Sequence, residues 1–112
     1  MFVRDEDTLF TDMGGGVTRR MRGYIGNLMA CEMTFKEGCY VEPHCHADHV
    51  QFIYVLKGKF ELTCGDEKKI CGPGDCCYAN YNEMHSTRCL EDGSVLLDVH
   101  NPMRPDILEE SK

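Results

Sequence analysis

The sequence lacks features that mark several common classes of protein. No run of apolar residues is long enough to span a bilayer, so we expect no contact with the membrane interior. Positive charge is scarce, because 12 Lys and Arg stand against 19 Asp and Glu, which gives a net charge of −7. Nucleic-acid binding depends mainly on basic contacts to phosphate, so we expect no nucleic-acid partner.

Export signals and cysteine motifs are also missing. The first residues, MFVRDEDTLF, are acidic and contain no apolar run, so they resemble neither a secretory signal nor a transit peptide. We therefore expect a cytoplasmic protein. The eight cysteines include no Cys-x-x-Cys pair, which argues against a cysteine-rich zinc site. Without export they should stay reduced and serve as small apolar residues of the core.

What the sequence does contain is a series of short β-prone runs within 112 residues, a length that suits one domain. Turn signals separate the runs at intervals of about 8–12 residues, which is typical of sandwiches and barrels. Strands are expected at residues 17–23, 28–35, 40–47, 51–56, 60–64, 68–71, 76–79, 85–90 and 94–100. We predict an N-terminal arm at 1–13, an all-β barrel at 14–104, and a C-terminal tail at 105–112 that forms one helical turn.

Histidines gather in one of these segments. His44 and His46 are two residues apart on a strand, so both point to the same side of the sheet. Gln51 opens the next strand and His85 begins a distant one. We predict that His44, His46, Gln51 and His85 bind one divalent metal ion, whether Ni, Zn, Mn or Fe. Four neutral ligands would leave the ion its full charge and keep it a strong Lewis acid.

A second group of polar residues lies near the C-terminus. Leu96, Asp98 and His100 share one face of the strand at 94–100. An Asp in mid-strand is disfavoured and is costly when buried without a partner. Two interpretations stay open: Asp98 is an acid or base beside the metal, or it forms a plain ion pair with an arginine. Arg104 follows a turn and could fold over the barrel mouth, where a guanidinium suits a substrate carboxylate.

Two motifs give these residues a family context. They read Gly38-x5-His44-x-His46-x4-Gln51-x6-Gly58 and Pro73-Gly74-Asp75-x9-His85. The pattern resembles the two motifs of the cupin superfamily, which usually has Glu at the position of Gln51. The resemblance implies a small double-stranded β-helix (jelly-roll) barrel with one metal inside. A barrel without metal, with hydrogen-bonded histidines in its pocket, is the alternative. His49 has no ligand position in the motif and is expected to cap a loop or line the rim.

Longer segments resemble the KdgF-type cupins of pectin degradation. These are HADHVQFIYVLKGKFELTCGDE, the ending LLDVHNPMRPDIL and the start GVTRR. The resemblance implies conversion of 4,5-unsaturated hexuronates, released by pectin or alginate lyases, to the linear keto form. It implies catalytic roles for Asp98 and Arg104, and substrate binding by His100, Arg104 and Arg20. His100 stands where that family usually has Phe.

The implied reaction is a ring opening that delivers a proton to C4 and forms a ketone. Our hypothesis is that Asp98 relays protons and Arg104 holds the substrate carboxylate. Three alternatives stay open: a three-His iron dioxygenase, another small-molecule isomerase or epimerase, and a non-catalytic sugar-binding cupin. We also expect a homodimer, because small cupins leave a strand edge and an apolar face that a partner can cover.

Overall fold

The computed structural model describes the backbone of residues 1–110 and the side chains of residues 1–107. Ten strands make up most of it, with a 3₁₀ turn at Asp5–Asp7 and one short helix, α1 (Pro105–Glu110), near the C-terminus. The strands are β1 (Leu9–Gly14), β2 (Val17–Ile25), β3 (Leu28–Phe35), β4 (Tyr40–His44), β5 (Val50–Lys57), β6 (Phe60–Cys64), β7 (Glu67–Cys71), β8 (Cys76–Ala79), β9 (His85–Cys89) and β10 (Ser94–Asn101).

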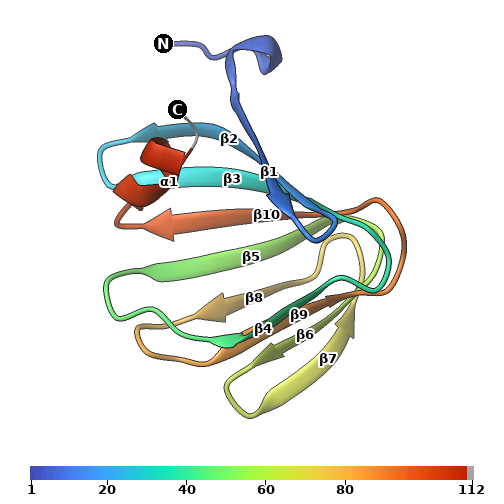
Figure 1. Cartoon of the computed structure of the whole chain (residues 1–112). Coiled ribbons are helices and arrows are strands. Elements are labelled where there is room, and N and C mark those ends of the chain that lie inside the picture. Colours follow the sequence, from blue (N-terminus) through green and yellow to red (C-terminus); the bar gives the residue numbers. More distant parts are fainter. Residues whose placement is uncertain (111–112) are drawn as a thin grey trace.

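Two antiparallel sheets face each other and form the barrel (Figure 1). One has six strands in the order β1-β2-β3-β10-β5-β8, and the other has four in the order β4-β9-β6-β7. Non-consecutive strands are therefore neighbours, as in a jelly roll. This confirms the predicted all-β jelly-roll fold. Within residues 1–110, no helix has the length and apolar character needed to cross a bilayer.

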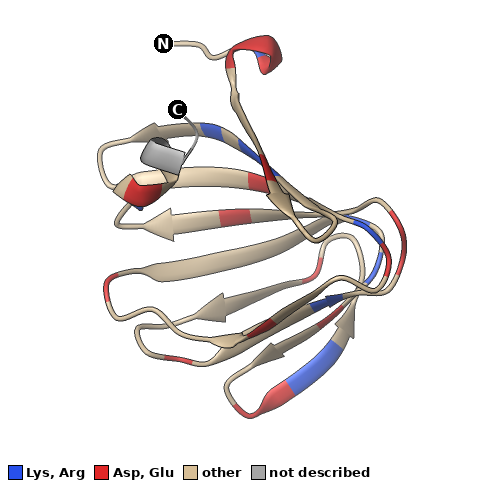
Figure 2. Cartoon of the chain, in the orientation of Figure 1, with Lys and Arg blue, Asp and Glu red and all other residues tan. Residues whose placement is uncertain are grey.

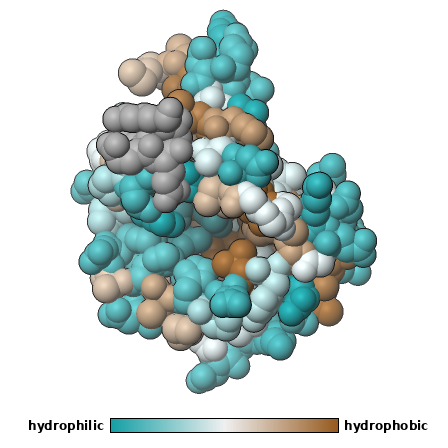
Figure 3. All heavy atoms as spheres, in the orientation of Figure 1, coloured by the Kyte–Doolittle hydropathy of each residue, from teal (hydrophilic) through white to brown (hydrophobic). Residues whose placement is uncertain are grey.

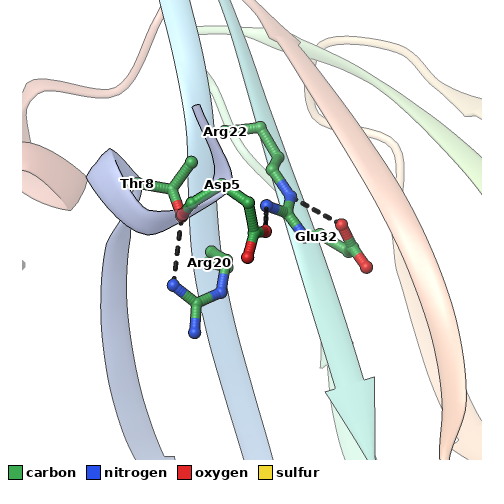
Figure 4. Close-up of polar contacts among 5 residues, drawn as sticks. All are labelled: Asp5, Thr8, Arg20, Arg22 and Glu32. Carbon is green, nitrogen blue, oxygen red and sulfur yellow. Dashed lines mark hydrogen bonds and ion pairs between the residues drawn. The ribbon is translucent and has the colours of Figure 1, made fainter. Parts of the chain in front are cut away.

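The N-terminal segment is bound more firmly than the sequence predicted. We expected a loose arm at 1–13, but residues 9–14 form β1 and pair along β2. Ahead of β1, Arg22 on β2 contacts Asp5 and also donates a 2.7 Å hydrogen bond to Glu32 on β3 (Figure 4). The backbone pairing of β1 depends on β2, so the sequence of residues 9–14 shows no clear strand pattern by itself. The expected helical turn is present as α1, and residues 111–112 lie outside the described part of the chain.

One part of the barrel interior is a tightly packed apolar core. Phe35 and Phe60 meet edge to face with their ring centroids 5.3 Å apart, a favoured aromatic geometry. Both Phe60 and Val55 are completely buried. We call this cluster the closed half of the barrel; its residues are Phe35, Ile53, Val55, Phe60, Leu62, Cys89 and Leu96.

The turn before β6 brings backbone against the core. Gly58 has a φ of +83°, and a Cβ atom there would lie 1.9 Å from Ser94 Oγ. Ser94 is fully buried, its Oγ accepts a hydrogen bond from the Lys59 amide, and it donates one to the Glu91 carbonyl. Only glycine fits this contact, since it both adopts positive φ readily and has no side chain.

A smaller cluster lies beneath α1. Ile107 is almost fully buried against Met21, Met29 and Cys31, so the helix covers one end of the β2–β3 pair. All eight cysteines are free thiols, but only Cys31 and Cys89 are fully buried. The prediction of core cysteines therefore holds for these two, whereas Cys45 and Cys76 are exposed.

Candidate metal centre

Three imidazoles converge where the two sheets open. His44 ends β4, His46 lies just beyond it, and His85 begins β9, directly opposite His44 in the strand pairing. Their ligand nitrogens all lie within 4.8 Å of one another. The ring centroids of His44 and His85 are 4.2 Å apart. The predicted spacing thus brings all three histidines to one point.

Backbone carbonyls orient two of these rings. His44 Nδ1 lies 2.8 Å from the carbonyl oxygen of Glu42, and His85 Nδ1 lies 3.0 Å from that of Glu83. A ring N–H that donates to a carbonyl leaves the lone pair on Nε2, which is the usual arrangement of metal-binding histidines. Each contact reaches back two residues along the chain, so the local backbone orients the ring.

Two buried polar atoms near the three histidines have no hydrogen-bond partner among the described residues. They are Nε2 of His85 and Oε1 of Gln51. Gln51 begins the inward-facing row of β5 and lines the same cavity as the three histidines. Unpaired buried polar atoms are rare and costly, and a divalent cation would satisfy both. The donor set of three imidazole nitrogens and one amide oxygen therefore fits a metal ion.

The surroundings favour the neutral form of two of these imidazoles, His46 and His85. Burial, with a further contribution from His49 and His44, lowers the pKa of His46 to about 4. Burial also lowers the pKa of His85 below its ordinary value, partly offset by the bond to Glu83. A metal binds the neutral ring, so protons compete little for these nitrogens near neutral pH.

The histidines line one side of a cavity of about 350 Å³. Figure 3 shows the molecular surface hollowed near its centre, with apolar atoms inside the hollow. The wall from the six-stranded sheet contributes Arg19, Cys31, Asp98 and His100, and Arg104 and Ile107 also line the cavity. We call this part of the interior the open half of the barrel. It combines polar groups with an apolar lining, as small-molecule sites commonly do.

Asp98 lies on the cavity wall in the middle of β10, where it is the one acidic position of that strand (Figure 2). Burial raises its pKa to about 7, although a hydrogen bond from the Gln51 side chain and the nearby charge of Arg104 act in the opposite direction. Its Oδ1 has no hydrogen-bond partner. Arg104 instead donates to Asp106, with Nη2 2.7 Å from Oδ2, so its ion pair is not with Asp98.

His100 and His49 extend the histidine cluster behind the three predicted ligands. His100 is buried and meets His49 edge to face, with ring centroids 5.0 Å apart. His49 in turn stacks on His46 at 4.2 Å. Burial lowers the pKa of His100 to about 3 and also lowers that of His49. His49, which was expected to cap a loop or line the rim, lies in the loop between β4 and β5, is 5% exposed and stacks on the ring of a predicted ligand.

Sequence comparison places this architecture in a known family. Residues 31–100 match the cupin domain family. The chain is 38% identical over 104 residues to the pectin degradation protein KdgF of Dickeya dadantii (strain 3937), which covers 93% of this chain and 94% of that protein. The chain is a cupin of the KdgF family.

Solved structures agree with this assignment. The structure of KdgF from a Halomonas species superposes with a TM-score of 0.90 at 32% identity, covering 96% of this chain and 99% of that one. An RmlC-like cupin from Shewanella frigidimarina gives a TM-score of 0.86, also at 32% identity, over 95% of this chain and 94% of that one. The resemblance thus spans nearly the whole barrel.

One predicted site residue of this KdgF-family chain lies on the wrong side of the sheet. Arg20 points away from the cavity, where it donates a 3.0 Å hydrogen bond to Thr8 (Figure 4) and lies over the Phe10 ring. Its neighbour Arg19 is buried and lines the cavity. Successive side chains on a strand alternate between faces, so only one of the pair can enter the barrel. Arg19 shares its face of β2 with Val17, which also lines the cavity, and the sequence alone carries no signal for which face turns inward.

Proposed function

We propose that this chain is a metal-dependent enzyme that opens 4,5-unsaturated hexuronates to their linear keto form. One observation carries the proposal: in a chain of the KdgF family, a three-histidine centre and Asp98 line one cavity. The substrates would be the unsaturated sugar acids that pectin or alginate lyases release.

The reaction is an isomerisation, so no atom is gained or lost. The substrate is a ring hemiacetal with a double bond between C4 and C5. Loss of the proton from the C1 hydroxyl forms an aldehyde as the bond between C1 and the ring oxygen breaks. The ring oxygen becomes the C5 ketone, and C4 takes up a proton. The site must therefore remove one proton and deliver another.

Asp98 is our candidate for both proton transfers. Its carboxyl lines the cavity, and Oδ1 has no partner to compete with a substrate hydroxyl. The Gln51 side chain lines the same cavity, and its hydrogen bonding favours the ionised form of the carboxyl. A single carboxyl can take the C1 hydroxyl proton and return it to C4, as general acid–base catalysis requires.

Other residues of the cavity bind and orient the sugar. Arg104 lines the cavity near the buried Ile107 and can donate to the substrate carboxylate. His100 occupies the cavity wall two residues beyond Asp98, and its ring can stack on a sugar face or donate a hydrogen bond. His44, His46, Gln51 and His85 would hold a divalent ion such as Ni, Zn, Mn or Fe. A bound ion would supply Lewis-acid polarisation of a substrate oxygen.

An ultraviolet assay tests the proposal. The conjugated double bond of an unsaturated uronate absorbs in the ultraviolet, so its absorbance should decay with enzyme and stop decaying after chelation. Adding back single divalent ions should restore the rate and identify the metal. Oxygen uptake with iron, in place of this decay, would favour a dioxygenase, and binding without decay would favour a sugar-binding cupin.

We also propose that the protein is a cytoplasmic homodimer. Support for dimerisation comes from large apolar side chains exposed on the six-stranded sheet and its turns, which are Tyr24, Ile25, Leu28, Phe52 and Tyr78. Burial of such a patch against a second copy would be favourable. Sedimentation equilibrium should give twice the chain mass, and a single-chain mass would contradict the dimer. Immunolocalisation or fractionation in the source cell would test the location.

A further inference from the structure

The three imidazoles of the candidate metal centre are not held in the same way. His44 ends β4 and His85 begins β9, and Nδ1 of each ring lies within 3.0 Å of a backbone carbonyl oxygen. His46 instead lies in the loop between β4 and β5. Its carbonyl accepts a 2.8 Å hydrogen bond from the Asn82 amide, but its ring forms no hydrogen bond with any residue that the structure describes. Ring contacts must therefore orient this imidazole.

His49 makes the flattest of these ring contacts. Its ring stacks on that of His46 with the centroids 4.2 Å apart and the planes inclined by 30°. The other rings against His46 belong to its fellow ligands His44 and His85, and they meet it at 78° and 45°. Among the described residues, His49 is thus the one ring outside the ligand set that lies against His46. A stacked neighbour limits the rotamers that a side chain can adopt.

The position of His49 is itself well fixed. The residue directly precedes Val50, where β5 begins, and its side chain is buried although Asp48 before it is exposed. On the side of β10, the ring meets His100 edge to face, with the centroids 5.0 Å apart and the planes at 85°. His49 is therefore held by the six-stranded sheet and can restrain a loop residue.

Hydrogen bonding within the protein does not explain why an imidazole is buried here. Nε2 of His49 is buried and has no hydrogen-bond partner among the described residues, which is costly for a polar atom. His49 is also not one of the residues that line the cavity of the proposed active site. Its contribution to the site is therefore made through the face of the ring that lies on His46.

We propose that His49 is a positioning residue that holds the His46 ring in the orientation needed to bind the metal ion. This inference rests on the proposed metal-dependent function and deepens it, because it assigns part of the metal affinity to a residue outside the ligand set. A ring that is already oriented loses less rotamer freedom when the ion binds. For His46, the stacked ring would replace the carbonyl partner that orients His44 and His85.

The test separates the ring face of His49 from its nitrogens and its volume. His49→Ala removes the ring, His49→Phe keeps a flat ring without nitrogens, and His49→Leu fills the space without a flat face. Ala47→Ser is a control at an exposed position of the same loop. The Zn²⁺ affinity of each apo-protein is measured by competition with a chromophoric chelator, and the visible spectrum of the Co²⁺-loaded protein reports the coordination geometry. The melting temperature of each apo-protein is recorded as well.

We expect His49→Ala to weaken Zn²⁺ binding about 10–100-fold, as the loss of a partner that orients a ligand ring commonly does, and to change the Co²⁺ spectrum. His49→Phe should stay within about threefold of the parent affinity and keep the parental spectrum, because the stacked face is retained. Ala47→Ser should match the parent. His49→Leu should weaken binding in the same direction as His49→Ala, and it supplies the result if His49→Ala does not fold.

The contrary outcomes are distinguishable. If the parent binds Zn²⁺ and both His49→Ala and His49→Leu bind it with parental affinity, with lower melting temperatures alone, His49 is only structural and the proposed function stands. If His49→Phe binds as weakly as His49→Ala, the ring face is not the cause and the positioning proposal is wrong. If the parent binds no divalent ion, the proposed metal-dependent function falls, and the role of His49 falls with it.

Discussion

The closed and open halves of this barrel share strands, but the closed half buries apolar side chains and the open half buries polar groups. In the closed half, β5 and β6 contribute Val55 and Phe60, which are completely buried among other apolar side chains. In the open half, β5 and β10 contribute Gln51 and Asp98, each with a buried oxygen that has no partner. Along the inward-facing side of β5, the side chains therefore change from Gln51, which has an unpaired buried oxygen, to Val55, which lies in the apolar core.

This contrast indicates where stability and chemistry reside. Burial of apolar surface stabilises the fold, whereas unpaired polar atoms lower the stability and are retained where a ligand will satisfy them. Proteins commonly lose some stability at active sites and recover it elsewhere. Substitutions in the closed half should thus change unfolding, and substitutions in the open half should change binding and rate.

The largest effect is expected in the closed half. Phe60→Ala would remove a completely buried ring that packs against Phe35, and should lower the free energy of unfolding by about 3–5 kcal/mol. Denaturant unfolding measures the change. The rate per folded molecule should stay close to that of the parent, and a Phe60→Ala protein that folds well but is inactive would contradict the division into halves.

The matching test in the open half is Asp98→Asn. Asn keeps the shape of the side chain but cannot carry the proton, so the rate should fall about 100-fold or more. The melting temperature and metal content should stay near the parental values. Conversion of the unsaturated uronate at the parental rate would contradict the acid–base role of Asp98.

Two glycines allow a test of how much close packing against Ser94 affects stability. Gly58 and Gly74 both have positive φ, but only at Gly58 would a Cβ clash, since nothing lies within 4 Å of the Cβ position at Gly74. Gly58→Ala should therefore cost about 1–3 kcal/mol more than Gly74→Ala, because the backbone strain is shared and the overpacking is not. Equal melting temperatures for the two variants would show that the structure around Ser94 accommodates the added methyl group at little cost in stability.

The smallest effect is expected at the mouth of the open half. The Arg104 guanidinium holds the pKa of Asp106 below its ordinary value of 3.8. A carboxyl with a lower pKa in the folded protein adds stability above its unfolded pKa, and this contribution is lost as the pH falls through the folded pKa. Asp106→Asn should lower stability by about 0.2–1 kcal/mol at about pH 7, as exposed ion pairs do.

The difference between the parent and Asp106→Asn should shrink as the pH falls below 3.8, the ordinary pKa of the carboxyl, and thermal melts across the acid range would reveal this. A constant difference at every pH would mean that the ion pair contributes nothing and that the substitution acts through packing.

Much of the fold could be predicted from the sequence because its signals are local. Strands at 28–35, 60–64 and 76–79 have the predicted ends, since residues typical of turns, such as glycine and asparagine, bound them. The histidine centre was predictable from the close spacing of His44 and His46, although β4 ends at His44 and His46 lies just beyond the predicted strand's observed end. The family resemblance supplied His85, which comes from a distant strand.

What could not be predicted depends on tertiary contacts. β1 needs β2 as its partner, so residues 9–13 alone show no pattern. The choice between Arg19 and Arg20 depends on which face of β2 turns inward, and one residue of register reverses it. His49 makes ring contacts with His46 in its own loop and with His100, which comes from the distant strand β10.

The most direct test of the central claim is a count of bound metal. Apo-protein prepared with a chelator, then titrated with single divalent ions by calorimetry and elemental analysis, should bind one ion per chain. The same titration of His85→Ala, with Cys45→Ala as a control at an exposed thiol between two ligands, should show loss of the ion only in the histidine variant. Parental metal binding by His85→Ala, or full activity of the metal-free parent, would contradict a metal centre formed by these residues.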